Sequence, residues 1–192
     1  MRRQLFLPGI LILTVISSIV AGWFFISTQT FHSHIIDPSR PVADIRMTDD
    51  EGRLFHLAKT EKKIVLLFFG YTHCPDECPL TLAHLKRALE MLGSEAAQKV
   101  QVVMVSTDPV RDTPEALNRY LNKFNPNFLG ITGSMDEMQK IYADYNVIVL
   151  EGGETHSTFV YVIDSARKLR LTFLPDTLPE DIAHDLRILL AH

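Results

Sequence analysis

Residues 64–92 read IVLLFFGYTHCPDECPLTLAHLKRALEML, and they contain both cysteines of the chain. The run opens with the continuous apolar segment Ile64–Phe69, which is typical of a strand buried on both faces. From Pro79 onward the leucines recur at helical spacing, which predicts a helix. Cys74 and Cys78 therefore lie at a predicted strand-to-helix junction, and we expect them to act as a pair.

The rest of the chain alternates strand patterns with helix patterns. A hairpin is predicted over 44–57, around a turn that ends at Gly52. Predicted strands cover 64–69, 100–106, 128–132, 158–164 and 169–174, and predicted helices cover 79–92, 113–124, 134–145 and 178–190. This order implies parallel crossovers and a sheet covered by helices on both faces, which is an α/β fold.

The bulk composition excludes two classes of protein. The chain has 192 residues, of which 46% are hydrophobic, so it can form one globular domain plus a short extra segment. Its net charge of −4 argues against nucleic acid as a partner, because there is no excess of basic residues to neutralise phosphates. Two cysteines are too few for a small fold held together by disulfides.

The extra segment lies at the N-terminus. Residues 5–26 read LFLPGILILTVISSIVAGWFFI and carry no charge, and at about 1.5 Å per residue they can cross a hydrocarbon layer of ~30 Å. Arg2 and Arg3 flank one side, which predicts a cytoplasmic N-terminus and an exported domain. A cleaved signal peptide is the alternative, but its apolar core is usually shorter.

We therefore expect a cytoplasmic N-terminus over 1–4, a transmembrane anchor over 5–26, a linker over 27–42 and one folded domain over 43–192. The stretch before the anchor is too short for a mitochondrial presequence. This favours a single-pass protein of a bacterial inner membrane, with its domain in the periplasm.

The spacing of the cysteines allows several kinds of chemistry. At the start of a helix, both sulfurs point the same way, and the positive end of the helix dipole lowers thiol pKa values. A Cα separation of about 6 Å at this spacing is also compatible with a disulfide. The pair can hold a metal, exchange electrons or form a structural disulfide, although a disulfide closing so short a loop stabilises a fold least.

A metal site needs further ligands, and the chain has eight histidines. His156 is the main candidate, because its loop leads directly into a predicted strand that can bring it to the thiols. His73 adjoins Cys74 but is expected to point to the opposite side, and the other histidines are interpreted as surface or packing residues. Two thiolates and one imidazole suit Cu(I), whereas structural zinc usually has four protein ligands.

Three stretches resemble the Sco/SenC/PrrC family of copper proteins. They are the cysteine motif over 69–79, the second signature STDPVRDTPE over 106–115, and the histidine-bearing strand that begins His156-Ser157-Thr158. The resemblance covers roughly residues 42–190. It implies a thioredoxin-like fold of the peroxiredoxin type, with a central mixed sheet flanked by helices and an N-terminal transmembrane helix.

The resemblance also implies a function. Cys74, Cys78 and His156 would bind one copper ion, as Cu(I) or Cu(II). The protein would be a metallochaperone that assists assembly of the binuclear copper site of cytochrome c oxidase. Its partners would be the copper-site subunit of that oxidase and either a copper donor or a thiol reductase.

Two departures from the family pattern leave the ligands intact, namely Glu77 where an aliphatic residue is common and Thr155 where aspartate is common. Asp108, Arg111 and Asp112 are interpreted as structural or partner-facing. A thiol–disulfide oxidoreductase acting on the oxidase or on other exported proteins, with Cys74 and Cys78 as its redox-active pair, is the main alternative. A peroxiredoxin-like peroxidase is disfavoured because Thr72 is one residue too close to Cys74 for that motif.

Overall fold

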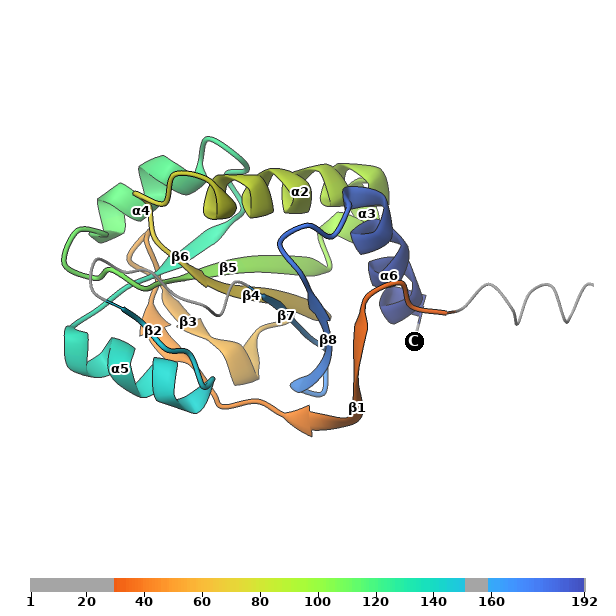
Figure 1. The fold of residues 1–192 in the computed structure, drawn as a ribbon, viewed down its shortest axis with the longest axis horizontal. Coiled ribbons are helices and arrows are strands. Elements are labelled where there is room, and N and C mark those ends of the chain that lie inside the picture. The colour runs from red at the N-terminus through yellow and green to blue at the C-terminus, as the bar shows by residue number, and fades with distance from the viewer. Residues whose placement is uncertain (1–29, 151–158, 192) are drawn as a thin grey trace, which may run out of the picture. The chain divides into compact units, whose positions relative to one another are not determined.

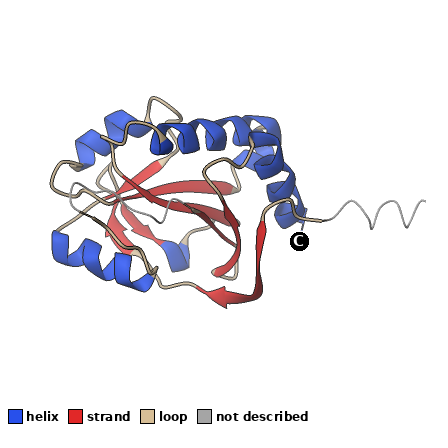
Figure 2. Cartoon of the chain, viewed as in Figure 1, coloured by secondary structure: helices blue, strands red, loops and turns tan. Residues whose placement is uncertain are grey.

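The computed structural model describes residues 30–150 and 159–191. Figure 1 shows strands enclosed between helices, and Figure 2 shows the same view by secondary structure. The strands are β1 (His34–Pro41), β2 (Arg46–Thr48), β3 (Leu54–His56), β4 (Ile64–Gly70), β5 (Val100–Ser106), β6 (Leu129–Ile131), β7 (Val160–Ile163) and β8 (Lys168–Phe173). The helices are α2 (Glu77–Leu92), α3 (Ser94–Ala97), α4 (Pro114–Leu121), α5 (Met135–Asp144) and α6 (Pro179–Ala191), with a 3₁₀ turn over Leu57–Lys59.

Six of these strands form one mixed sheet in the order β1-β8-β7-β4-β5-β6. Strands β4, β5 and β6 are parallel, whereas β7, β8 and β1 continue the sheet in antiparallel pairs. Strands β2 and β3 form the separate predicted hairpin. The predicted α/β class with a central mixed sheet is confirmed, and β4, which leads to the cysteines, lies between two other strands.

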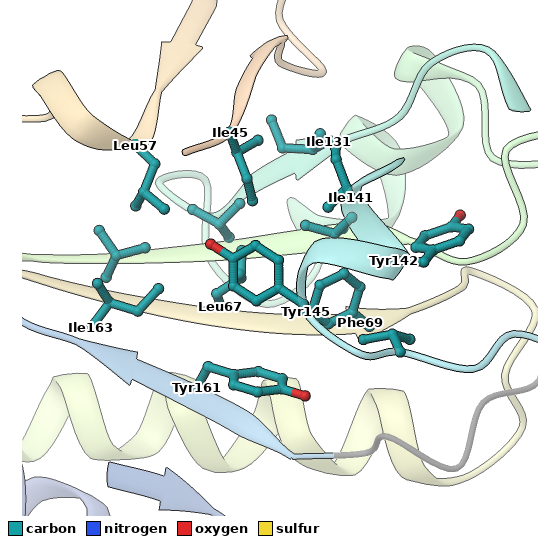
Figure 3. Close-up of a cluster of buried hydrophobic side chains, with 14 of the residues drawn as sticks. Ile45, Leu57, Leu67, Phe69, Ile131, Ile141, Tyr142, Tyr145, Tyr161 and Ile163 are labelled. Atoms are coloured by element: carbon teal, nitrogen blue, oxygen red, sulfur yellow. The ribbon is translucent and has the colours of Figure 1, made fainter. Parts of the chain in front are cut away.

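Strand β4 is buried at every position, as its unbroken apolar sequence predicts. One face of the sheet packs against α5 and the hairpin, where Tyr142, Tyr145 and Tyr161 surround Phe69 at centroid distances of 6.4, 5.6 and 5.9 Å (Figure 3). Helices α2 and α4 cover the opposite face (Figure 1). The site-bearing strand is thus held between two apolar layers.

The predicted helix starts are confirmed at two places. The Thr113 hydroxyl accepts a hydrogen bond from the Ala116 N–H at 3.2 Å at the start of α4, and Ser134 and Glu137 form the predicted capping box of α5. Helix α2 begins at Glu77, two residues earlier than predicted, because the first turn of a helix tolerates proline. Cys78 therefore lies inside the helix rather than before it.

The linker prediction needs correction at its C-terminal end. Residues 34–41 form β1, which pairs with β8 at the edge of the main sheet. The two prolines in this stretch argue against a regular strand, but an edge strand tolerates residues without an N–H on its unpaired side. Residues 34–41 form a strand because they pair with β8, which lies far away in the sequence.

The predicted N-terminal tail and anchor, over 1–4 and 5–26, lie outside the described residues. Within residues 30–150 and 159–191, no helix combines the length and hydropathy that a membrane crossing requires.

Candidate metal centre

The two cysteines meet at the junction of β4 and α2, as predicted. Cys74 lies in the connecting loop and is partly exposed, whereas Cys78 lies in the first turn of α2 and is 8% exposed. Both are free thiols, and the backbone N–H of Cys78 donates to Cys74 Sγ at 3.4 Å. The junction therefore presents one accessible sulfur next to one buried sulfur.

There is room for the Cys78 side chain because the adjacent residue, Gly70, has no side chain. A Cβ placed on Gly70 would lie 2.7 Å from Cys78 Sγ and 3.1 Å from the ring of Phe68. The first distance is shorter than van der Waals contact, so a side chain at position 70 would displace the thiol. Gly70 ends β4, and it is needed here for close approach rather than for an unusual backbone conformation.

We expect Gly70→Ala to weaken metal binding at this pair by about tenfold or more, the range typical of residues that orient metal ligands. Competition against a chelator of known Cu(I) affinity measures this effect. Gly133→Ala is the matched control, because a Cβ there meets the flexible end of the Met47 side chain, at 2.5 Å. Equal losses in both variants would contradict a specific role for Gly70.

Burial changes the acidity expected of Cys78. Loss of solvent raises the pKa of its thiol well above the usual value, a hydrogen bond from the Tyr71 backbone opposes the rise, and Cys74 and Glu77 add to it. The pKa of Cys78 is therefore shifted in the direction opposite to the one expected from the helix start, because desolvation is the largest influence on it. A thiolate here requires a bound cation or additional hydrogen-bond donors.

The second signature is tied to the cysteine loop through a buried carboxylate. Asp112 is fully buried and accepts hydrogen bonds from Ser106 Oγ at 2.7 Å and from Thr72 Oγ1 at 2.5 Å. The backbone N–H of Thr72 also donates to it, at 3.2 Å. Asp112 thereby fastens the loop before Cys74 to the end of β5.

The neighbouring residues of this signature reinforce that junction. Asp108 is buried, its N–H donates to Ser106 Oγ at 3.0 Å, and its carboxylate pairs with Arg111. The hydroxyl of Tyr142 donates to the Ser106 carbonyl at 2.6 Å. These contacts favour the structural interpretation of Asp108 and Asp112.

The histidines are placed as follows. His73 is exposed, and its Nδ1 lies 3.0 Å from Thr72 Oγ1. Other ring contacts include those of His56 with Asp44, of His84 with the Thr177 carbonyl, and of His32 with Asp181 and with the stacked ring of His184. His156 lies outside the described residues, and among the described ones no three His, Cys, Asp or Glu side chains are arranged to hold a metal.

Two structural features of the site were not predicted from the sequence. Gly70 was assigned no role, although its position directly after the predicted strand 64–69 was a usable signal. The hydrogen bond from Thr72 to Asp112 joins residues 40 positions apart, and no local sequence pattern predicts such a pairing.

Comparison with known proteins places this geometry in context. The SCO1/SenC family model matches residues 35–191. A SCO2-like protein of Rickettsia conorii is 31% identical over 153 residues, which cover 75% of this chain and 74% of that protein.

Two solved structures have the same fold. Apo Sco1 from Thermus thermophilus is 36% identical with a TM-score of 0.71, over 82% of this chain and 96% of that one. ScoI of Bradyrhizobium japonicum, solved with copper bound, is 33% identical with a TM-score of 0.66, over 77% of this chain and 98% of that one. Together with the mixed sheet described above, these likenesses confirm the predicted thioredoxin-like fold.

Proposed function

Because this chain belongs to the SCO1/SenC family, we propose that it is a copper-binding protein that assists the assembly of the binuclear copper site of cytochrome c oxidase. One copper ion, as Cu(I) or Cu(II), binds to Cys74, Cys78 and His156. The observation that carries the proposal is the convergence of the two free thiols at the β4–α2 junction. The copper-bound state of the Bradyrhizobium japonicum relative supports the choice of metal.

The proposed ligands, two thiolates and one imidazole, suit a copper ion that the protein binds and then transfers. Thiolates are soft ligands, and Cu(I) accepts low coordination numbers. The unequal burial of the two sulfurs suits transfer, because a partner's ligand can reach Cys74 from solvent while Cys78 still holds the ion. Release then proceeds by ligand exchange that begins at the exposed sulfur.

The proposed setting is a bacterial inner membrane, with residues 5–26 as the anchor and the folded domain in the periplasm. An uncharged N-terminal run flanked by Arg2 and Arg3 supports this orientation. The proposed partners are the copper-site subunit of the oxidase and a copper donor or a thiol reductase.

Metal analysis of the detergent-solubilised full chain tests the proposal. The reduced chain should bind one copper per molecule, and oxidation of the pair to a disulfide should abolish binding because it removes both thiolates. His156→Ala should weaken binding strongly, with His84→Ala, which alters a helix-face histidine, as the control. Full-strength copper binding by the His156 variant would remove the three-ligand model.

A thiol–disulfide oxidoreductase is the second candidate, and one contact favours it. The Cys78 N–H that donates to Cys74 Sγ stabilises negative charge on an accessible sulfur, as a nucleophilic thiolate needs. This function requires both cysteines but not His156. An oxidase-assembly assay in which the His156→Ala variant retains activity and the cysteine variants lose it would favour the second candidate over the first.

A further inference from the structure

A second concave surface lies where the chain passes from β8 to α6. It is a cleft of about 270 Å³, and the copper site proposed above does not use it. The side chains that set its chemistry come from the segment before β1, from β1 itself, from the β8–α6 connection and from α6: His32, His34, Leu174, Asp176, Leu178 and Asp181. No lysine or arginine is among the described residues that line it.

One wall of the cleft is apolar and exposed. Leu174 and Leu178 are 47% and 51% exposed, and both belong to the β8–α6 connection. A tight turn holds them, since the Thr177 N–H donates to the Leu174 carbonyl at 3.0 Å and the Leu174 N–H donates to Thr177 Oγ1 at 2.9 Å. Single exposed leucines are common, but two on one turn that line the same cleft give it an apolar wall.

The cleft also carries negative charge that is only partly compensated. Asp181 Oδ1 lies 2.6 Å from His32 Nδ1, so a protonated His32 can neutralise it. Asp176 is exposed and has no hydrogen-bond or ion-pair partner among the described residues. A concave surface lined by one sign of charge attracts ligands of the opposite charge. An exposed carboxylate beside two exposed leucines therefore favours a ligand that is both cationic and partly apolar.

The opposite wall is fixed in place by a buried carboxylate. Asp185, on α6, is fully buried and accepts hydrogen bonds from the backbone N–H groups of His32 at 2.8 Å and Ser33 at 3.0 Å. These contacts attach the segment before β1 to α6. The cleft is thus already formed without a ligand, as most binding sites are.

The cleft lies close enough to the cysteines to share a partner with them. His84 Nδ1, on α2, is 3.0 Å from the Thr177 carbonyl, and Figure 1 shows the β8–α6 connection beside α2. Cys78 precedes His84 on this helix by about 9 Å of axial rise. Leu80, one turn before His84, is also 47% exposed. A standard interface covers about 800 Å² of each partner, or a disc of about 16 Å radius, so a protein docked at the cysteines also covers the cleft.

We propose that this cleft binds an arginine or lysine side chain of the protein that docks at the cysteine pair. Such a side chain places its apolar stem along Leu174 and Leu178 and its charged end beside Asp176. A lipid surface fits less well, because membranes attract basic rather than acidic segments. The inference rests on the proposed function for the identity of the partner, but not for the chemistry of the cleft.

Binding of the copper-free, detergent-solubilised full chain to the exported copper-site domain of the oxidase tests the inference. Asp176→Lys should lower the affinity by about tenfold, mainly through slower association, and should make it less dependent on salt. Leu178→Ser should also weaken binding, because the stem loses an apolar contact. Glu61→Lys is the matched control, since it reverses an exposed carboxylate before β4, at the end of that strand remote from the cysteines.

Two results of this experiment would contradict the inference. If Asp176→Lys and Glu61→Lys bind with the same affinity, the carboxylate in the cleft has no specific role. If Leu178→Ser weakens binding while Asp176→Lys does not, the occupant of the cleft is apolar rather than cationic.

A small probe separates this inference from the proposed function. N-acetylarginine amide is titrated into the full chain while the methyl NMR signals of Leu174 and Leu178 are followed. These signals should shift and saturate at about millimolar concentrations in the wild type, and the shifts should be lost in Asp176→Asn. If the copper-site domain does not bind the wild type, the proposed partner fails and this titration still decides the role of the cleft. Absent shifts in the wild type, or equal shifts in Asp176→Asn, would overturn the inference.

Discussion

Replacing Cys78 by alanine should lower the Cu(I) affinity of the full chain by about a hundred- to a thousandfold. Four-ligand metal sites in small domains bind with about 10–16 kcal/mol, or roughly 2.5–4 kcal/mol for each ligand. At about 1.4 kcal/mol for a factor of ten, loss of one thiolate gives this range. Cys74→Ala should show a loss of similar size, because each cysteine supplies one sulfur. Chelator competition on the reduced protein measures both.

Cys78 is buried, so loss of folding must be separated from loss of a ligand. Thr81→Ala is a suitable control, since Thr81 is buried in the same helix but has no thiol. Denaturation curves of the metal-free variants show whether each remains folded. If folded Cys78→Ala retains wild-type Cu(I) affinity, the cysteine pair is not the copper site and the proposed function loses its main support.

Replacing Asp112 by alanine should reduce the free energy of unfolding by about 3 kcal/mol, because hydrogen bonds to a buried carboxylate contribute about 1.5–3 kcal/mol each and some donors will find water. Ser106 Oγ is fully buried and would be left without this acceptor, whereas Thr72 is partly exposed. The midpoint of denaturant unfolding in the metal-free protein measures the change. Copper affinity should also fall, because the loop before Cys74 loses its attachment to β5.

Asp76→Ala provides the comparison for Asp112→Ala. Asp76 is an exposed carboxylate in the same loop, and exposed substitutions usually change stability by no more than about 0.5 kcal/mol. Similar stability losses in the two variants would mean that Asp112 contributes no more than surface charge. Asp112→Asn should fall between them, because its amide oxygen can still accept while its NH₂ group faces hydrogen-bond donors.

The helices and strands that depend on short-range sequence patterns were predictable. The apolar run of β4 and the capping box of α5 were located from neighbouring residues alone, because burial on both faces and helix capping leave short-range signals. Strand β1 was missed, since its sequence alone reads as a linker and only pairing with β8 makes it a strand. The third ligand, His156, remains a prediction from the sequence.

The sequence by itself determined that two thiols stand together at the start of a helix, directly after a buried strand. Only the tertiary structure decided that Cys78 is buried against Gly70 and that Asp112 accepts hydrogen bonds from Thr72. The reason is physical. Periodicity reports which residues share a face of one element, whereas solvent exposure and hydrogen-bond partners depend on which elements the sheet order brings together. The thiols were visible in the sequence, but the environment that controls their charge comes from strands and helices distant along the chain.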